Sequence, residues 1–199
     1  MRPNPCAKAA AALAALALGA FAPVTPPSAT AAEDAATTIT VLGLTDLHGR
    51  IERTTDPATG AVVDPGAVTL ACEVARAREL NPAALLVSSG DNIGDSAAAS
   101  APPGDRPALD VLNAMGVDAS ALGGHELDRG PEDLSGRILP AAAFPYLAAN
   151  LADPALGSEG DGGALIKDVD GVRVGIIGVI TDALPSSVAP AAEIGRAHV

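Results

Sequence analysis

The sequence predicts an α/β fold with a largely parallel sheet, and three observations lead to this prediction. From residue 38 onward, apolar β-branched runs alternate with segments of helical periodicity, which is the pattern that βαβ units produce. Polar residues gather directly after the predicted strands, where the loops of an open α/β sheet meet. The length of 199 residues suits a single domain.

The individual elements follow from local patterns along the chain. The run TITVLGL is apolar and β-branched, which is typical of a buried strand, whereas GAVTLACEVARAREL places its small and apolar residues on one helical stripe. A proline begins and a glycine ends a further helix, and an Asp-Gly pair joins the last two strands as a hairpin. The expected strands are 38–44, 83–89, 118–122 and 145–151, the expected helices are 66–80, 107–116 and 130–140, and the expected hairpin is 164–180.

Residues 1–31 have the composition of a secretory signal peptide. Arg2 and Lys8 form a basic start, an apolar stretch of about a dozen residues follows, and the sequence A-T-A gives a cleavage site. A transmembrane helix needs ~20 apolar residues. We therefore expect cleavage and export, with residues 32–37 as a linker and no stable membrane anchor.

The chain is acidic, with 12 basic and 24 acidic side chains. Removal of the leader takes away Arg2 and Lys8, which leaves 10 basic against 24 acidic residues and a net charge of −14. Because nucleic-acid binding calls for a basic face, we expect no nucleic-acid polymer as a partner, and metal cations are more natural ones. Cys72 is the only cysteine beyond the leader, so an internal disulfide is excluded; its helical position without a nearby histidine favours a buried thiol over a reactive one.

Acids and histidines follow the ends of successive predicted strands. The loops at the carboxyl ends of parallel strands converge on one crevice, so we expect these residues to lie together. Imidazole and carboxylate ligands suit zinc, manganese or iron better than calcium, and a shared carboxylate can bridge two ions. The residues are Asp46 and His48 after the first strand, Asp91 after the second, His125 and Asp128 after the third and Asn150 at the fourth, with Gly49, Gly90 and Gly94 allowing close approach of the backbone.

Each of these motifs has an ordinary structural explanation when taken alone. Asp46 would serve as a helix cap, His48 as a surface histidine and Asp91 as the start of a turn. Their joint placement after consecutive strands favours the metal site. The segment 153–163 is rich in glycine and acids but lacks EF-hand spacing, so we expect a plain surface loop rather than a calcium site.

Three ordered motifs resemble those of a known family. TDLHGRIE, GDNIGDS and NAMGVDASALGGHELDRG, followed by FPYLAANL, are similar to the exported 5′-nucleotidase branch of the calcineurin-like metallophosphoesterases, whose marks are D-x-H-G, G-D-x-x-x-G-S and G-N-H-E-x-D. The resemblance extends from about Thr38 to Pro185. It implies the amino-terminal part of a four-layer α/β/β/α sandwich. It also implies a phosphohydrolase that uses two divalent metal ions, such as zinc or manganese, on nucleotides or other phosphate esters.

The resemblance also implies a role for each matching residue. Asp46 and His48 would hold the first metal ion, and Asp91 would bridge to the second one. His125, oriented by Asp128, would polarise the phosphate and assist the leaving group. A metal-bound water would be the nucleophile.

Two departures from the family pattern bear on function. Gly124 stands where the family has an asparagine whose amide oxygen binds the second metal ion, so this second site loses a ligand. A functional variant and a crippled enzyme both remain open. The family's later histidine ligands and its carboxyl-terminal domain have no counterpart here, since only His198 follows the matched region. We therefore expect residues 38–192 to be a partial catalytic domain and this chain to be a fragment.

The final segment EIGRAHV, residues 193–199, equals the translation of a common sequencing-library adapter. We expect this tail to be non-native and the natural protein to continue past Ala192. The expected parent is thus a secreted phosphohydrolase of the 5′-nucleotidase type. The alternatives are a non-catalytic acidic cation-binding module and a cyclic-phosphodiesterase or sulfur-ester hydrolase on the same scaffold.

Overall fold

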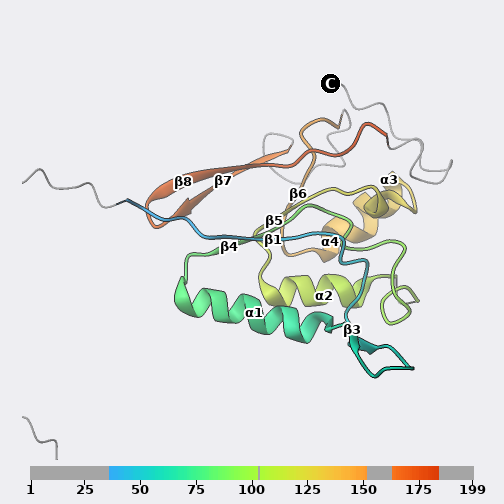
Figure 1. Cartoon of the computed structure of the whole chain (residues 1–199). Helices are drawn as coiled ribbons and strands as arrows, with labels where there is room; N and C mark the ends of the chain where they lie inside the picture. Colours follow the sequence, from blue (N-terminus) through green and yellow to red (C-terminus); the bar gives the residue numbers. More distant parts are fainter. Residues whose placement is uncertain (1–35, 103, 152–162, 184–199) are drawn as a thin grey trace, which may run out of the picture. The chain divides into compact units, whose positions relative to one another are not determined.

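The computed structural model describes residues 36–102, 104–151 and 163–183. The chain divides into two units, residues 1–37 and Thr38–Val199. The fold presented below belongs to the second unit (Figure 1).

Several expectations concern residues outside these ranges and stay predictions. They are the signal peptide 1–31, the linker 32–37 except its last two residues, the tail 193–199 and the loop 153–163 except Gly163. Within the described ranges, no helix is long and apolar enough to cross a bilayer.

A four-stranded parallel sheet forms the centre of the unit, as the sequence predicted. Its strands lie in the order β1-β4-β5-β6, and each one runs parallel to its neighbour. The register pairs Val41 with Leu85 and Val87 with Ala119. The carboxyl ends of the strands therefore meet at one edge. The strands are β1 (Val41–Leu44), β4 (Leu85–Ser88), β5 (Ala119–Ala121) and β6 (Tyr146–Leu147), each shorter than its predicted run.

Two helices, α1 (Gly66–Leu80) and α2 (Arg106–Met115), cover one face of this sheet (Figure 1). Helix α1 buries a stripe that includes Val74, as predicted. Cys72 is exposed, so the predicted burial of its thiol is wrong. Because it lies two positions before Val74, it projects roughly 200° around the helix from that buried residue.

The hydrophobic core joins the two helices to the sheet. Complete burial of one leucine side chain contributes about 1.5–3 kcal/mol to the stability of the fold. The core therefore stabilises the sheet, and the polar loops of the site extend from one edge of this sheet. The most deeply buried members of the core include Leu86, Leu109, Leu112, Leu122, Leu127, Leu134, Ile138 and Tyr146.

The helix predicted for residues 130–140 is present and continues without a break through three segments, the middle of which is a π-helical segment, η2 (Leu134–Ile138). A 3₁₀ turn, η1 (His125–Leu127), precedes it. Pro140 has no N–H to donate within a helix, and the π turn before it widens the backbone where a regular helix is interrupted. The flanking α-helical segments are α3 (Pro131–Asp133) and α4 (Leu139–Ala141).

Two antiparallel hairpins complete the described fold. The predicted hairpin is formed by β7 (Ala164–Val169) and β8 (Val172–Ile177). Its turn residues Asp170 and Gly171 have φ angles of 52° and 81°, as a type I′ turn requires. A second hairpin was not predicted, because its strands are too short for an alternating pattern. It pairs β2 (Thr54–Thr55) with β3 (Val62–Asp64).

The β7–β8 hairpin lies over the sheet face opposite α1 and α2 (Figure 1). Lys167 of β7 forms an ion pair with Asp118, and Asp118 also accepts a hydrogen bond of 2.8 Å from the amide of Leu86. Ile166 and Ile177 remain largely exposed. The described elements therefore build a helical layer, a parallel sheet and a hairpin layer.

Candidate metal centre and active site

The residues predicted for the site lie on three loops at the carboxyl edge of the sheet. The loops after β1 and β4 are joined by main-chain hydrogen bonds. The amide of Asp46 donates to the carbonyl of Gly90 over 3.2 Å, and the amide of His48 donates to the carbonyl of Asp91 over 3.0 Å. The two loops therefore run side by side beyond the end of the sheet.

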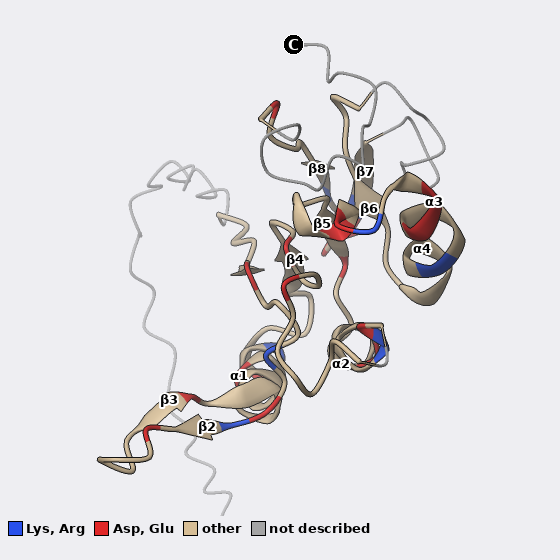
Figure 2. Ribbon diagram, turned by 90° about the vertical axis from the view of Figure 1, so that its right-hand side faces the viewer, with Lys and Arg blue, Asp and Glu red and all other residues tan. Residues whose placement is uncertain are grey.

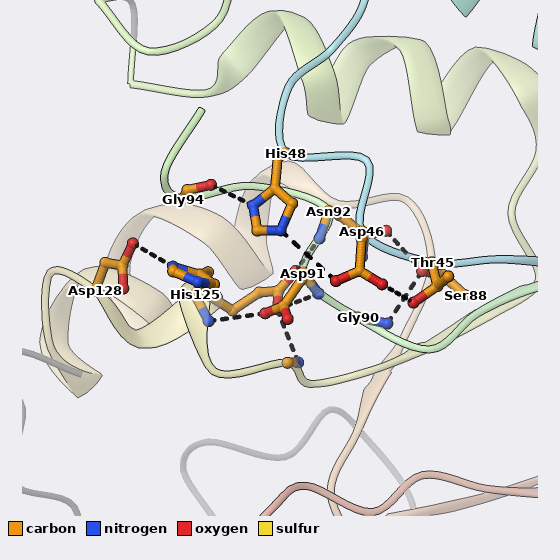
Figure 3. A network of polar contacts seen from close by, with 12 residues as sticks. Thr45, Asp46, His48, Ser88, Gly90, Asp91, Asn92, Gly94, His125 and Asp128 are labelled. Carbon is orange, nitrogen blue, oxygen red and sulfur yellow. Dashed lines mark hydrogen bonds and ion pairs between the residues drawn. The ribbon is translucent and has the colours of Figure 1, made fainter. Parts of the chain in front are cut away.

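Asp46, His48 and Asp91 come together as predicted (Figure 3). Each residue offers one ligand atom, and these three atoms lie within 4.8 Å of one another. The φ angles are 53° for Asp46, 43° for His48 and 52° for Asp91. Such angles are uncommon for residues other than glycine and concentrate at functional sites. The backbone of all three residues is thus held in a disfavoured conformation that places their side chains together.

A hydrogen bond selects which nitrogen of His48 faces the other two residues. Nδ1 lies 2.8 Å from the carbonyl oxygen of Gly94. Because a carbonyl can only accept, Nδ1 carries the hydrogen in the neutral ring and Nε2 keeps its lone pair. Nε2 lies 3.7 Å from Oδ1 of Asp46. Metal-bound histidines are generally oriented in this way by an acceptor at the other nitrogen.

His125 and Asp128 form the second predicted pair. Nδ1 of His125 lies 3.0 Å from Oδ2 of Asp128, and this hydrogen bond raises the pKa of His125 above its ordinary value of 6.5. The rings of His125 and His48 meet edge to face, with centroids 4.9 Å apart. The amide of His125 donates to Oδ1 of Asp91 over 2.9 Å. The histidine pair and the metal-ligand group are therefore adjacent.

Two of the predicted glycines are required by close contacts between loops. A Cβ atom on Gly90 would lie 2.3 Å from the nitrogen of Gly123, and one on Gly94 would lie 2.3 Å from the carbonyl oxygen of His125. Both glycines also have positive φ angles. No other residue type fits at these positions without a shift of the backbone.

Glu126 contributes to the site and was not singled out from the sequence. Its side chain is 2% exposed. Its carboxylate accepts hydrogen bonds of 2.8–3.0 Å from the amides of Asp91, Asn92 and Gly123. Burial raises the pKa of Glu126 to about 7, against the lowering effect of these bonds. Its place in the quoted motif GGHELDRG was the available signal, but the motif alone assigns it no role.

Asp95 differs from the family pattern, and Asn150 has defined hydrogen-bond partners. Asp95 stands where the motif G-D-x-x-x-G-S has its second glycine, a third departure that was not recognised from the sequence; its φ of 42° explains why a glycine suits this position. The side-chain amide of Asn150 exchanges hydrogen bonds of 2.8 and 3.0 Å with the backbone of Ile180.

The donor set fits one divalent ion. Two carboxylates and one imidazole nitrogen form a mixed oxygen and nitrogen site of the kind used by zinc, manganese and iron. Within the described ranges, Asp46, His48 and Asp91 form the group whose possible ligand atoms lie close together. Gly124, beside it, supplies no side-chain donor, and its φ of −65° and ψ of −39° are ordinary helical values.

Acidic positions occur throughout the described ribbon, whereas basic ones form only short stretches (Figure 2). A cavity of about 120 Å³ lies beside His125 and is lined by Asp128, Arg129 and Arg137 among others.

Comparisons with known proteins give the relationship of the chain. No family model matches it. It is 32% identical over 204 residues to the cell wall protein Lmo0130 of Listeria monocytogenes, covering 88% of this chain and 26% of that protein. It is also 32% identical over 178 residues to the 5′-nucleotidase of Mus musculus, covering 85% of this chain and 30% of that protein. The chain thus spans less than a third of the length of these relatives.

Solved structures agree with these sequence matches. The 5′-nucleotidase precursor from Thermus thermophilus superposes with a TM-score of 0.60 at 25% identity, covering 77% of this chain and 31% of that chain. The calcineurin-like phosphoesterase YfkN from Bacillus subtilis gives a TM-score of 0.54 at 25% identity, covering 74% and 50%.

These likenesses first define a class. The parallel sheet and its edge loops are those of a calcineurin-like metallophosphoesterase, so the predicted fold class is confirmed. Within that class, the chain belongs to the 5′-nucleotidase family and matches the amino-terminal part of its members.

Proposed function

We propose that the protein to which this chain belongs is an exported, metal-dependent phosphohydrolase that releases phosphate from nucleotides. The convergence of Asp46, His48 and Asp91 within 4.8 Å, beside the His125–Asp128 pair, carries this proposal. The 5′-nucleotidase relatives support the choice of substrate class. The leader composition and the likeness to a cell wall protein support export. We also propose that this chain is an incomplete piece of its parent.

The metal-ligand group would bind one divalent ion through one atom of each residue. Asp46 and Asp91 would contribute carboxylate oxygens, and His48 would contribute Nε2, which its bond to Gly94 leaves available. When bound, such an ion supplies charge stabilisation at a phosphate oxygen and lowers the pKa of a water. Without a bound cation, the carboxylates of Asp46 and Asp91 would repel a phosphate group, because like charges repel.

His125 would donate a proton or hydrogen bond to the substrate. The hydrogen bond to Asp128 raises the pKa of His125, so the ring stays protonated to a higher pH than an unperturbed histidine does. The bond from Nδ1 to Asp128 leaves the Nε2 hydrogen to point at a phosphate oxygen or at the leaving oxygen. Asp128 thus orients the ring and stabilises its charge, as carboxylates do for catalytic histidines.

The number of bound ions is a separate part of the proposal. Asp91 would be the carboxylate that bridges the two ions. Gly124 offers no ligand to a second ion, so we propose that the second site of this chain is weaker than the first one. If a water replaces the missing amide oxygen, the second ion would still bind and the protein would be a functional variant. If no water does so, the enzyme would be crippled.

The test is metal-dependent release of phosphate from AMP by the parent protein. We expect turnover with manganese or zinc, its abolition by chelation, and a loss of about 100-fold or more in His125→Ala. Glu132→Gln, which changes an exposed carboxylate on α3, is the matched control and should retain full activity. Equal inactivity of the wild type and His125→Ala would overturn the hydrolase assignment.

Gly124 favours one rival function, a non-catalytic acidic module that binds a cation. In that case, calorimetry would show cation binding that Asp91→Asn abolishes, while AMP, a cyclic nucleotide and a sulfur ester would all remain intact. Turnover of the cyclic nucleotide or the sulfur ester, but not of AMP, would instead assign a different hydrolase on the same scaffold.

A further inference from the structure

Glu126 connects two of the three loops that form the site. Oε2 of Glu126 accepts hydrogen bonds from the amides of Asp91 and Gly123 over 3.0 and 2.8 Å. Oε1 accepts one from the amide of Asn92 over 2.9 Å. Asp91 and Asn92 follow β4, whereas Gly123 follows β5. A single buried carboxylate therefore holds both loops by their main chains.

We propose that Glu126 is a positioning residue that fixes the backbone of Asp91 in the conformation needed to bind a metal ion. The inference rests on the proposed metal site, because Asp91 is the ligand that Glu126 positions. It extends that site by assigning a task to a residue outside the group Asp46, His48 and Asp91.

The first reason is the disfavoured backbone of Asp91. Its φ of 52° lies in the left-handed region, where a residue other than glycine persists only if the surrounding structure holds it. The Glu126 carboxylate holds the nitrogen of that same residue. An ionised carboxylate makes stronger hydrogen bonds to backbone amides than a neutral acceptor does.

The second reason is that the connection between the loops is reciprocal. The amide of Asp91 donates to the side chain of Glu126, and the amide of His125 donates to the side chain of Asp91 over 2.9 Å. The first bond fixes the backbone of Asp91, and the second fixes its carboxylate. One oxygen of Asp91 thus has a defined partner, and a carboxylate has a second oxygen with which to bind an ion.

The third reason is that the loop around Asn92 is anchored in the core. The side chain of Asn92 is fully buried, accepts a hydrogen bond of 2.6 Å from Ser88 and donates one of 2.9 Å to Ser120. Burial, with a smaller contribution from the charge of Glu126, raises the pKa of Tyr146, which keeps its hydroxyl neutral. The loop that carries Asp91 is therefore held at Asn92 both by the core, through the Asn92 side chain, and by Glu126, through the Asn92 amide.

Glutamine cannot replace Glu126 in this arrangement although it has the same shape. Both carboxylate oxygens accept backbone N–H groups, whereas a glutamine has one accepting oxygen and one NH₂ group. In either orientation of the amide, the NH₂ group would face at least one backbone N–H. The variant would lose one or two hydrogen bonds and leave buried donors unpaired.

The experiment compares cobalt binding by metal-free wild type, Glu126→Gln and Glu132→Gln, measured by absorption spectroscopy well below each melting temperature. We expect Glu126→Gln to lose about 10-fold or more in affinity, as is common when support of a ligand is removed. Its visible spectrum should also change, because the ligand geometry changes. Glu132→Gln, the same chemical change at an exposed position, should match the wild type. An affinity and spectrum of Glu126→Gln equal to the wild type would overturn the proposal.

A second measurement covers the case in which Glu126→Gln does not fold. Hydrogen exchange by NMR in the metal-free wild type should show protected amides for Asp91, Asn92 and Gly123, whose amides donate to Glu126. Rapid exchange of all three would refute the positioning role. If the wild type binds no cobalt while these amides are protected, the proposed metal site fails and the loop connection stands, so the two failures can be distinguished.

Discussion

Gly124 illustrates how one residue can limit a site without disturbing its structure. Its backbone has ordinary helical angles, so nothing in its conformation requires a glycine. It follows directly on Gly123, which by contrast has no room for a Cβ because one would lie 2.3 Å from the nitrogen of Asp91. The first glycine of the pair is therefore required by packing, whereas the backbone angles of the second one suit any residue type.

The variant Gly124→Asn should therefore fold normally and restore a ligand for a second ion. We expect the binding stoichiometry for manganese or zinc to rise from one towards two in isothermal titration calorimetry of the metal-free protein. Gly136→Asn makes the same change at an exposed position and should bind as the wild type does. An unchanged stoichiometry in Gly124→Asn would show that the missing amide is not what limits the second site.

The His125–Asp128 pair predicts a pH dependence with a defined sign. Because the hydrogen bond to Asp128 raises the pKa of His125 in the folded state above 6.5, the pair stabilises the fold at pH values below 6.5. This contribution is lost as the pH rises through the folded-state value. NMR titration of the metal-free protein should give a His125 pKa above 6.5, and Asp128→Asn should lower it. A pKa that is identical in the two proteins would contradict the pairing.

At the scale of elements, the site depends on how closely loops can cross. The loops after β4 and β5 touch at Gly90 and Gly123, where a Cβ on Gly90 would lie 2.3 Å from the Gly123 nitrogen and 2.7 Å from its Cα. The positive φ of 99° at Gly90 adds strain for any other residue. Both obstacles come from backbone atoms, which cannot move aside as a flexible side chain can.

Gly90→Ala should therefore lower the free energy of unfolding by about 2 kcal/mol or more, through overpacking and backbone strain. Urea denaturation followed by circular dichroism measures this change. Gly136→Ala is the control, since a Cβ there meets nothing within 4 Å, and its effect should stay within about 1 kcal/mol. Equal stability of the two variants would mean that the loops can separate without cost.

At the scale of the whole molecule, a bound ion should stabilise the folded state. An ion that binds the native state alone adds about 2.7 kcal/mol at a concentration 100 times its dissociation constant. We expect manganese or zinc to raise the melting temperature of the metal-free protein in a concentration-dependent manner, measured by calorimetry. Asp91→Asn should abolish the shift. A shift of the same size in that variant would place the ion elsewhere.

Much of the fold was predictable because the hydrophobic pattern and the topology of parallel sheets act together. The runs around β1, β4, β5 and β6 are apolar, and polar residues follow them directly, so the shared edge could be inferred from the sequence. The ligand group Asp46, His48 and Asp91 was predicted on this basis, and its residues do converge.

Other features depend on contacts between distant residues and could not be predicted from local patterns. The partners of the Glu126 carboxylate are amides on two different loops, those of Asp91 and Gly123, which are far apart in the sequence. The exposure of Cys72 depends on which face of α1 meets the sheet. The β2–β3 hairpin has too few residues to give a period, and the π turn before Pro140 reflects a local interruption that sequence periodicity does not reveal.

The main-chain bonds between the loops have a consequence for protein engineering. The amides of Asp46 and His48 donate to the loop after β4, and Glu126 joins that loop to the next one. The conformation of each loop therefore depends on hydrogen bonds to a neighbouring loop. A designer who grafts the DLHG segment alone onto another scaffold would transfer two ligands without the partners that orient them. The smallest transferable unit is a set of three consecutive strand–loop modules, moved together with their relative spacing.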